Sequence, residues 1–520
     1  MSERCRIGWK GIWGCLLAMA FSSTALAGLT DSMTVCRRLL LNKRAAIDDF
    51  AVWAFDNPAF KHVKYPVTLN EIKAGTVLRN EDLAAVQAEG NGQRTGLVEV
   101  KAFIRKRNQS LWGSARYEGG LKMGRKWSET SDYHLLYPYV MGDTVGGDLK
   151  SECYAFAGGY SHRKGKYTLG VEASYEAVIE HRNADPRPKN LSGKLYISLG
   201  AARQINNNYA VGISVLAHKY KQTNDLQFYN ELGVPNIYHF TGLGTDYYRF
   251  RGAKGSAFYK GRSFGGSIGL IPLHSLQSGW TTTFSYKYFS FDKIISSLNE
   301  LPMASVGEHQ IKGEVAWRKM NNADMGWGIR ASVQHKGRTG TEHIFGDATG
   351  NFYPQIASVK QFFNRYMRVE AAFYSEWFPF LNRSLSVHPT IGYTTDRTSY
   401  VYPSRLMDSK RMDVSVAFRL KCMCRRWLWQ GEVGTGYDAV LHTALKLPQE
   451  VTEEEALLNR PVYADGAYQA ANRIMAHLYA RVDYDMKRNY ALFLTVRYAF
   501  ARDIRPSVAH GVDAAVGVAF

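Results

Sequence analysis

The chain ends in residues 511–520, which read GVDAAVGVAF and alternate in character from one residue to the next. The apolar side chains on the even positions are Val512, Ala514, Val516, Val518 and Phe520, and the odd positions carry glycine, alanine or aspartate. A period of two is typical of a β-strand that buries one of its faces. The end of the chain therefore predicts a strand, and the segments before it indicate which kind of sheet this strand joins.

The same alternation returns upstream in residues 412–420, 476–486 and 490–500, where large apolar residues oppose charged ones. In a transmembrane barrel the apolar face meets lipid and the charged face lines a wet lumen, whereas a soluble sandwich must expose the charged face to bulk water. We expect lumen positions for Asp413, Arg419, Glu432, Arg481, Asp483, Asp485 and Arg497. These charges either pair across strands or form a constriction that selects solutes by charge, and the sequence leaves both readings open.

The connections between strands alternate between short and long, as in a barrel with tight periplasmic turns and longer outer loops. Counted back from Phe520, the short connections are 487–489, 422–426, 377–383 and 320–324, and the long ones are 501–510, 438–473, 396–408 and 337–362. In the N-terminal half, tight turns fall near 107–109, 162–165 and 203–207, with long connections at 80–95, 123–150, 181–189 and 222–245. Over so many strands, this parity favours a closed barrel over a soluble β-protein.

Residues 66–520 thus predict an all-β fold, a transmembrane antiparallel β-barrel of about 18 strands within a range of about 16–20. Residues 246–305 are ambiguous because they contain three strand-like stretches where the parity requires an even number. The count is therefore about 18 or about 20 strands, and we favour the smaller number.

The first residues resemble a secretory signal. Arg4, Arg6 and Lys10 form a basic region, an apolar core follows, and Ala25-Leu26-Ala27 forms a cleavage site. The apolar stretch is too short to span the membrane as a helix. We expect residues 1–27 to be a signal peptide that is cleaved after export.

Residues 28–65 form an N-terminal arm before the barrel. Val35, Leu39, Leu40, Ile47 and Phe50 recur at roughly helical spacing, which predicts a short periplasmic helix. The arm either inserts into the lumen as a plug or lies along the lower rim of the barrel, and we favour the rim.

The formal net charge is +19, and the mean hydropathy of −0.29 excludes a helical membrane protein. Many basic residues crowd the short turns: Arg105, Lys106, Arg107, Arg163, Lys164, Lys166, Arg318, Lys319, Lys421, Arg425, Arg426, Lys487 and Arg488. A basic periplasmic rim meets anionic lipid headgroups at about 1 kcal/mol per residue, so outer-membrane lipids are the expected partner and nucleic acid is not. An acidic periplasmic protein or a lipoprotein is the alternative partner. One outer connection, 438–473, is itself acidic through Glu453, Glu454 and Glu455.

Catalytic and metal-binding patterns are weak. His343 with Asp347, and Tyr133-His134 with Asp143, fall on expected outer loops but in no distinctive motif. Cys422 and Cys424 are separated by one residue, a poor spacing for structural zinc, and we interpret them as turn residues. We expect neither an enzyme nor a cofactor.

Residues 66–520 resemble an uncharacterised family of Bacteroidota outer-membrane β-barrel proteins. The likeness rests on Asp185-Pro186-Arg187 and on Gly242-Leu243-Gly244 leading into Arg262-Ser263-Phe264-Gly265-Gly266. A weaker likeness is to FadL-type transporters of hydrophobic compounds, through Asn57-Pro58-Ala59 in a position similar to that of their hatch. The first resemblance implies an outer-membrane location, and the second implies a hatch.

We therefore expect a channel or transport protein of the outer membrane. A scaffold for a surface or periplasmic partner is the alternative, and an outer-membrane hydrolase is a weaker one. The C-terminal aromatic Phe520 resembles the signal that barrel-assembly machinery recognises, which makes this machinery a further expected partner.

Overall fold

The computed structural model describes residues 33–42, 50–229, 236–252, 255–273, 278–321, 325–350, 352–377, 382–487, 489–504 and 507–520. The predicted signal peptide, residues 1–27, lies outside these ranges. Within them, no helix combines the length and the apolar character that a membrane-spanning helix needs.

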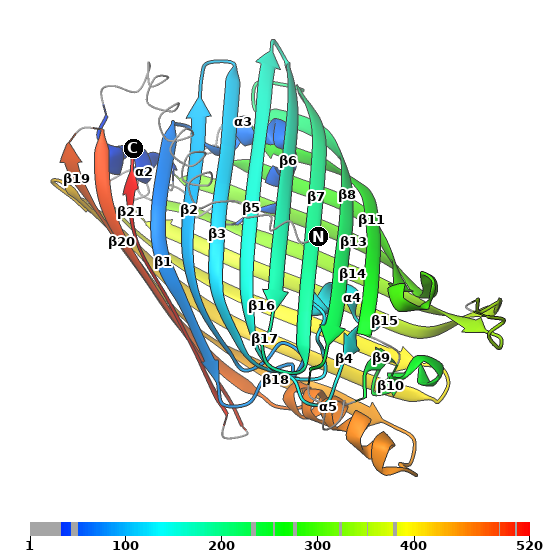
Figure 1. Cartoon of the computed structure of the whole chain (residues 1–520). Coiled ribbons are helices and arrows are strands. Elements are labelled where there is room, and N and C mark those ends of the chain that lie inside the picture. Colours follow the sequence, from blue (N-terminus) through cyan, green and yellow to red (C-terminus); the bar gives the residue numbers. More distant parts are fainter. Residues whose placement is uncertain are drawn as a thin grey trace.

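The fold is a closed antiparallel barrel of 18 strands, in which each strand pairs with its neighbours along the chain (Figure 1). The barrel strands are β1 (Leu69–Glu81), β2 (Gly92–Arg105), β3 (Gln109–Arg125), β5 (Gly147–Lys164), β6 (Tyr167–His181), β7 (Arg187–Gln204), β8 (Tyr209–Gln227), β11 (Gly255–Pro272), β12 (Gly279–Ile295), β13 (Leu301–Asn321), β14 (Met325–Phe345), β15 (Gln355–Trp377), β16 (Arg383–Tyr400), β17 (Arg405–Cys424), β18 (Trp427–Lys446), β19 (Arg473–Lys487), β20 (Tyr490–Asp503) and β21 (Val508–Ala519). The predicted fold class and the favoured strand number are confirmed.

The remaining elements lie before the barrel or in its connections. They are α2 (Val35–Asn42), η2 (Trp53–Asp56), η3 (Pro58–Phe60), α3 (Lys61–Lys64), α4 (Tyr133–Leu136), β4 (Met141–Gly142), β9 (Tyr238–Gly242), β10 (Thr245–Asp246), η4 (Tyr248–Phe250), η5 (Ser296–Leu298) and α5 (Glu453–Gln469).

The barrel closes between its first and last strands. β21 pairs with β20 on one side and with β1 on the other. Beyond the last strand residue, the backbones of Asn70 and Phe520 exchange two hydrogen bonds of 2.9 Å. The C-terminal residue thus belongs to the seam that leaves the sheet without a free edge, which is what a sheet in lipid requires.

The ambiguous segment 246–305 contributes two complete strands, β11 and β12. Its third stretch is the beginning of β13, a strand of 21 residues that starts at Leu301. The parity rule was therefore sound, and only the assignment of this last stretch was open.

Side chains alternate between the two faces of the barrel as expected. The outward apolar residues Leu478, Leu494 and Val516 are about half exposed, at 48%, 49% and 59%. Their neighbours along each strand point into the barrel. An apolar outer face of this kind is the surface that lipid covers in a transmembrane barrel.

One end of the barrel carries the short turns, and we call it the turn end; the other is the loop end. The first and last strands begin and finish at the turn end, at the top of Figure 1. Several loop-end connections are shorter than expected, because the strands continue as long hairpins. The expected loops 337–362 and 396–408 reduce to 346–354 and 401–404 between β14 and β15 and between β16 and β17.

The N-terminal arm lies inside the barrel at the turn end. The ring of Phe50 packs on Tyr374 with centroids 4.7 Å apart, and the Trp53 backbone N–H donates to Glu314 Oε1 at 3.3 Å. Further along, the Asn57 side-chain amide donates to the Ile213 carbonyl at 3.0 Å. The preference for the rim was wrong. The arm's apolar residues find the buried surface they need on the inner wall, which offers small and aromatic side chains at these positions.

At the loop end, two connections fold into the barrel mouth. β4 from connection 126–146 and β10 from connection 228–254 both pair with β9, forming a small three-stranded sheet. Its core residues Tyr139, Met141 and Phe240 pack against the barrel-wall residues Tyr220 and Phe291. This loop-end plug fills the lumen on the side of β8 to β14.

The helix α5 covers the plug from outside. A capping box between Thr452 and Glu455 starts it, and the acidic first turn suits the positive end of the helix dipole. Leu458 and Val462 lie on the inner face of α5 and are buried. The acidic segment of the long connection is thus a helix terminus, where carboxylates stabilise the structure.

Candidate functional site: a charged chamber in the lumen

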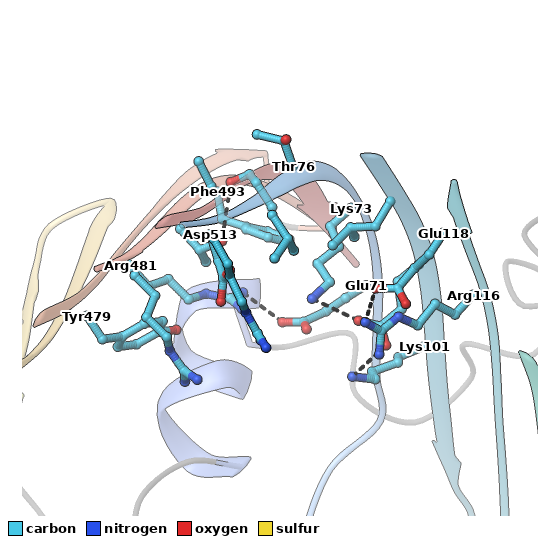
Figure 2. Close-up of a pocket in the computed structure, with 18 of the residues that line it drawn as sticks. Glu71, Lys73, Thr76, Lys101, Arg116, Glu118, Tyr479, Arg481, Phe493 and Asp513 are labelled. Atoms are coloured by element: carbon cyan, nitrogen blue, oxygen red, sulfur yellow. Dashed lines mark hydrogen bonds and ion pairs between the residues drawn. The ribbon is translucent and has the colours of Figure 1, made fainter. Parts of the chain in front are cut away.

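On the side of the barrel that the plug leaves open, the lumen contains a cavity of about 550 Å³ (Figure 2). Strands β1, β2, β3, β19, β20 and β21 form its wall. Its charged lining residues are Glu71, Lys73, Arg79, Glu99, Lys101, Arg116, Glu118, Arg481, Arg497 and Asp513. We call this cavity the chamber. Its volume lies within the range of small-molecule sites, although its lining is far more polar than usual.

Most of the chamber's charges are paired. Lys73 and Lys101 share Glu99, with Nζ–O distances of 2.8 and 2.9 Å. Arg116 pairs with Glu118 two residues along the same strand. These pairs order the wall, because each carboxylate accepts hydrogen bonds from fixed cationic donors.

Arg481 is held by two carboxylates. Its Nη2 lies 2.7 Å from Glu71 Oε1 across the seam and 2.7 Å from Asp483 Oδ1 on its own strand. The Arg481 side chain also covers the ring of Phe493, with 4.0 Å from Cζ to the ring centroid. This arginine joins β19 to β1 at the bottom of the chamber.

Two arginines of the chamber have a different environment. Within the described residues, neither Arg79 nor Arg497 forms an ion pair with a carboxylate. Arg497 stands in register with Asp513 on the next strand and lies 5.7 Å from the Tyr479 ring centroid. The chamber therefore contains two guanidinium groups that form no ion pair with the described carboxylates of the wall.

We call the arm helix α2 the floor of the chamber, because it packs against Phe493, a residue of the cavity lining. Val35, Cys36 and Leu39 are buried against Phe493 and Leu428 of the wall. α2 has no acidic residue of its own in its first turn.

Asp485 on β19 supplies that missing charge, because its Oδ1 accepts the Cys36 backbone N–H at 3.0 Å. A carboxylate at this position satisfies a free N–H and favours the positive end of the helix. Asp485, expected as a lumen charge, anchors the arm.

A second cavity of about 330 Å³ lies toward the loop end and shares Arg79 and Gln93 with the chamber. It is lined further by Lys122, by residues 89–91 of the first loop-end connection and by Gly92 at the start of β2. The two cavities follow the wall of β1 to β3, and Arg79 stands where they meet. The two cavities therefore form a polar stretch of the lumen along β1 to β3, and α2 packs against the wall at its turn end.

The motif Asn57-Pro58-Ala59 fixes the arm to the opposite wall. Gly170 and Gly200, which are paired across β6 and β7, leave the space it occupies. A Cβ at Gly170 would stand 2.5 Å from the Ala59 N, and a Cβ at Gly200 would stand 2.0 Å from Asn57 Oδ1. The glycines are therefore a docking groove for the arm, a role that their spacing in the sequence does not reveal.

The next part of the arm is held by two further wall residues. His62 Nδ1 lies 2.7 Å from Ser110 Oγ, and Arg105 Nη1 donates to the carbonyls of His62 and Tyr65. Burial, together with Arg105 and Arg163, lowers the pKa of His62 to about 4. Arg105, expected to face lipid headgroups with the other basic turn residues, instead turns inward to clamp the arm.

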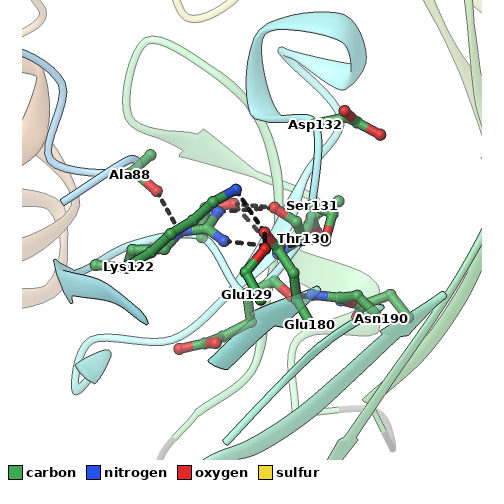
Figure 3. A network of polar contacts seen from close by, with 12 residues as sticks. Ala88, Lys122, Glu129, Thr130, Ser131, Asp132, Glu180 and Asn190 are labelled. Atoms are coloured by element: carbon green, nitrogen blue, oxygen red, sulfur yellow. Dashed lines mark hydrogen bonds and ion pairs between the residues drawn. The ribbon is translucent and has the colours of Figure 1, made fainter. Parts of the chain in front are cut away.

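The loop-end plug is fastened by a buried polar network (Figure 3). Glu180 on β6 is fully buried and accepts from Lys122 Nζ at 2.5 Å, from Arg125 Nη1 at 3.2 Å and from the Ser131 hydroxyl. Nearby, Arg182 Nη2 lies 2.9 Å from Glu129 Oε1. Since Ser131 and Glu129 belong to connection 126–146, these contacts tie the plug to the wall.

The other predicted lumen residues face inward but lie away from the chamber lining. Asp413 lies 2.7 Å from Arg368 Nη1, and Arg419 pairs with Glu432, which also lies 2.8 Å from His477 Nε2. These ion pairs link β15 to β17, β17 to β18 and β18 to β19. Sequence reasoning missed the chamber residues on β1 to β3, although Glu71 and Lys73, Glu99 and Lys101, and Arg116 and Glu118 each carry the same period of two.

The structure separates the weak catalytic combinations. His343 lies 2.8 Å from Ser358 Oγ, while Asp347 pairs with Arg249. His134 Nε2 lies 3.1 Å from Glu89, and Asp143 accepts from the backbone of its own turn.

Cys422 and Cys424 are the last residues of β17 and not turn residues as expected, since β17 continues to the turn itself. All four described cysteines are free thiols. No group of three or more His, Cys, Asp or Glu side chains suited to a metal ion occurs in the described part of the chain.

Comparison with known proteins places most of the chain in one family. Residues 58–520 match the model described as "Family of unknown function (DUF6850)". The chain belongs to this family. The resemblance to a family of unknown function is thereby confirmed, while the source in Bacteroidota stays a prediction. A comparison with curated proteins gives no match.

Solved structures show a distant likeness in the barrel. The copper transporter OprC has a TM-score of 0.42 at 7% identity, over 83% of this chain and 61% of that chain, so the chain spans about three fifths of its length. The siderophore receptor PiuA from Acinetobacter baumannii gives 0.39 at 7% identity, over 87% and 82% of the two chains. The open form of the ferric-catecholate import receptor Fiu from E. coli K12 gives 0.38 at 8% identity, over 87% and 81%. The likeness concerns the fold alone, and the FadL-type likeness finds no support in these matches.

Proposed function

We propose that this protein is a gated transport channel of the outer membrane, with the loop end outside and the turn end in the periplasm. The observation that carries the proposal is the route of two polar cavities along β1 to β3, which a separate N-terminal segment closes at one end. Two features support this orientation. The outer face of the barrel is apolar, and the short turns lie at the end where β1 begins and β21 ends. Export through a signal peptide in residues 1–27 and assembly through Phe520 belong to the same proposal.

The arm is the gate in this proposal. Its described residues, 33–42 and 50–65, contribute no strand to the barrel, so their removal breaks none of the ladder hydrogen bonds that close the sheet. They are nevertheless buried against the wall, at α2 and again from Phe50 to Phe60. A segment of this kind can leave the lumen while the barrel persists, and a periplasmic partner that binds the released arm would favour the open state.

Planar-bilayer conductance tests the proposal. We expect the full chain to be nearly closed and a chain lacking residues 28–65 to conduct, because the deletion removes the floor of the chamber. The heat-dependent shift on SDS gels checks that the deleted chain is folded. A folded deletion variant that passes neither ions nor small solutes would refute a transport role.

A scaffold role is the second candidate, and the partial filling of the lumen by the loop-end plug, together with the arm at the turn end, favours it. It predicts that the deletion variant stays closed and that a stoichiometric partner copurifies with the full chain. Recovery of conductance without any partner would contradict it.

A further inference from the structure

We infer that the chamber binds a small anionic solute, whose carboxylate or phosphate oxygens are held between Arg79 and Arg497. This inference rests on the proposed function, since it names the class of solute that the channel would carry.

The charges of the chamber are not balanced. Six cationic and four acidic side chains line it. Lys73 and Lys101 have only Glu99 between them, so that group keeps a positive charge. Arg481 lies between the carboxylates of Glu71 and Asp483, so that group keeps a negative charge.

The remaining charges are those of Arg79, Arg497 and Asp513. One carboxylate cannot offset two guanidinium groups, so this part of the wall is positive as well. The positive lysine group and the negative Arg481 group cancel, and the Arg116–Glu118 pair is neutral, so the net positive charge of the chamber is that of Arg79 and Arg497 with Asp513.

The two arginines stand on the strands that flank β21. Arg79 on β1 is in register with Gly511 on β21, and Arg497 on β20 is in register with Asp513. A Cβ placed on Gly511 would lie 3.9 Å from Arg79 Cγ, so the missing side chain leaves the path across β21 open at the level of Arg79. Both arginines line one cavity, and Asp513 is the carboxylate between their strands.

A guanidinium group is planar and presents paired N–H donors that fit carboxylate and phosphate oxygens. Arg79 and Arg497, which pair with no carboxylate among the described residues, have these donors available. Gln93 and Thr495, which line the same cavity, add neutral donors suited to hydroxyl or carbonyl groups.

The position of Arg79 gives the site a place on the route. Arg79 lines both the second cavity and the chamber, so a solute that comes from the loop end meets Arg79 first and then Arg497, which lines only the chamber of these two.

Isothermal titration calorimetry on the purified full chain tests the inference directly. The probes are malonate, inorganic phosphate and glucose. We expect malonate or phosphate to bind and glucose not to bind, and a preference between the two anions identifies the group that the site recognises. Binding of glucose equal to that of both anions, or no binding of either anion, would overturn the inference.

Substitutions locate the site. Arg79→Gln and Arg497→Gln should each weaken anion binding about tenfold or more, since a charge-assisted hydrogen bond contributes about 1.5–3 kcal/mol. Arg94→Gln is the matched control: it removes the same charge from β2, one residue from Gln93, but in register with Leu78 and Leu121 on the outer face. Anion binding that Arg94→Gln reduces as much as the other two would overturn the assignment. If a glutamine variant fails to fold, the corresponding lysine variant, Arg79→Lys or Arg497→Lys, is measured instead. It should still weaken anion binding because the planar pair of donors is lost.

Conductance separates this inference from the proposed function. If the chain lacking residues 28–65 conducts but passes potassium and chloride equally, and the full chain binds neither anion, only the anion site is refuted. If malonate or phosphate binds through Arg79 and Arg497 but the deleted chain does not conduct, the site stands and the transport role fails.

Discussion

Asp485 shows how one side chain on the barrel wall holds the N-terminal arm in place. It accepts the Cys36 backbone N–H, and the helix that begins there is the floor of the chamber. A contact at the first turn of a helix typically contributes about 0.5–2 kcal/mol. Such a contribution is small for the barrel but large for the docking of one short helix.

Asp485→Ala should therefore raise the rate at which a maleimide labels Cys36 by roughly 2- to 30-fold, because labelling of a buried thiol requires local opening. The experiment uses a chain in which the other cysteines are serine. Asp485→Asn keeps an oxygen that can accept the N–H and should stay close to the parent. Equal labelling in all three chains would show that Asp485 does not hold the helix.

His62 makes the docking of the arm depend on pH. Its pKa is lowered to about 4 in the docked arm, against an ordinary value of about 6.5, because burial and Arg105 disfavour the charged ring. The neutral ring is therefore the docked form. Docking is at full strength above about pH 6.5 and weakens as the pH falls from there toward 4, by roughly 2–3 kcal/mol in all.

We expect faster hydrogen–deuterium exchange in residues 50–65 at pH 5 than in His62→Gln at the same pH, and no difference between the two chains at pH 7.5. The comparison at equal pH cancels the intrinsic exchange rate. A wild-type chain as protected as His62→Gln at pH 5 would contradict the assignment.

At the scale of elements, the arm and the wall are matched through glycine. Gly170 and Gly200 have no side chains where Asn57 to Ala59 approach, so the groove exists only because β6 and β7 carry glycine at paired positions. Side chains on the arm then fill the groove, and the close fit excludes water. The same glycines would look like weak points in a strand if the arm were absent.

Gly200→Val should release the arm, since its Cβ alone would stand 2.0 Å from Asn57 Oδ1. We expect conductance close to that of the chain lacking residues 28–65, and faster maleimide labelling of Cys36. Gly158→Val on β5 is the matched control, because a Cβ there has no heavy atom closer than 3.9 Å. A closed channel in Gly200→Val would contradict the docking groove.

At the scale of the whole molecule, stability and gating reside in different parts. Hydrogen bonds join each barrel strand to both of its neighbours, and the pairing of β1 with β21 closes the ring. The arm and the loop-end plug add packing inside this closed wall. A barrel with a continuous ladder has no edge to expose when an inner segment leaves.

The chain lacking residues 28–65 should therefore keep the folded migration on unboiled SDS gels, with a midpoint of heat conversion within a few degrees of that of the full chain. Removal of β21 by truncation at residue 507 should abolish the folded band, because it opens the sheet. A deletion of the arm that also abolishes the folded band would show that the arm is part of the barrel's core.

The sequence by itself determined the barrel. Alternation in residues 476–520 and the parity of the connections specify the strands, their faces and the turn end, because the period of side chains in a strand and the needs of a sheet in lipid are local rules. The inward positions of Asp413, Arg481 and Arg497 follow from the same rules.

The tertiary structure alone decided where the arm lies, which lumen charges are paired and where the chamber is. Arg481 meets Glu71 across a seam between the two ends of the chain, and Asp485 caps a helix that begins at residue 35. That Arg79 and Arg497 meet no carboxylate partner among the described residues is likewise a result of closure. These relations depend on which strands become neighbours when the sheet closes and on which segments fold inside it, and no periodicity along the chain encodes them.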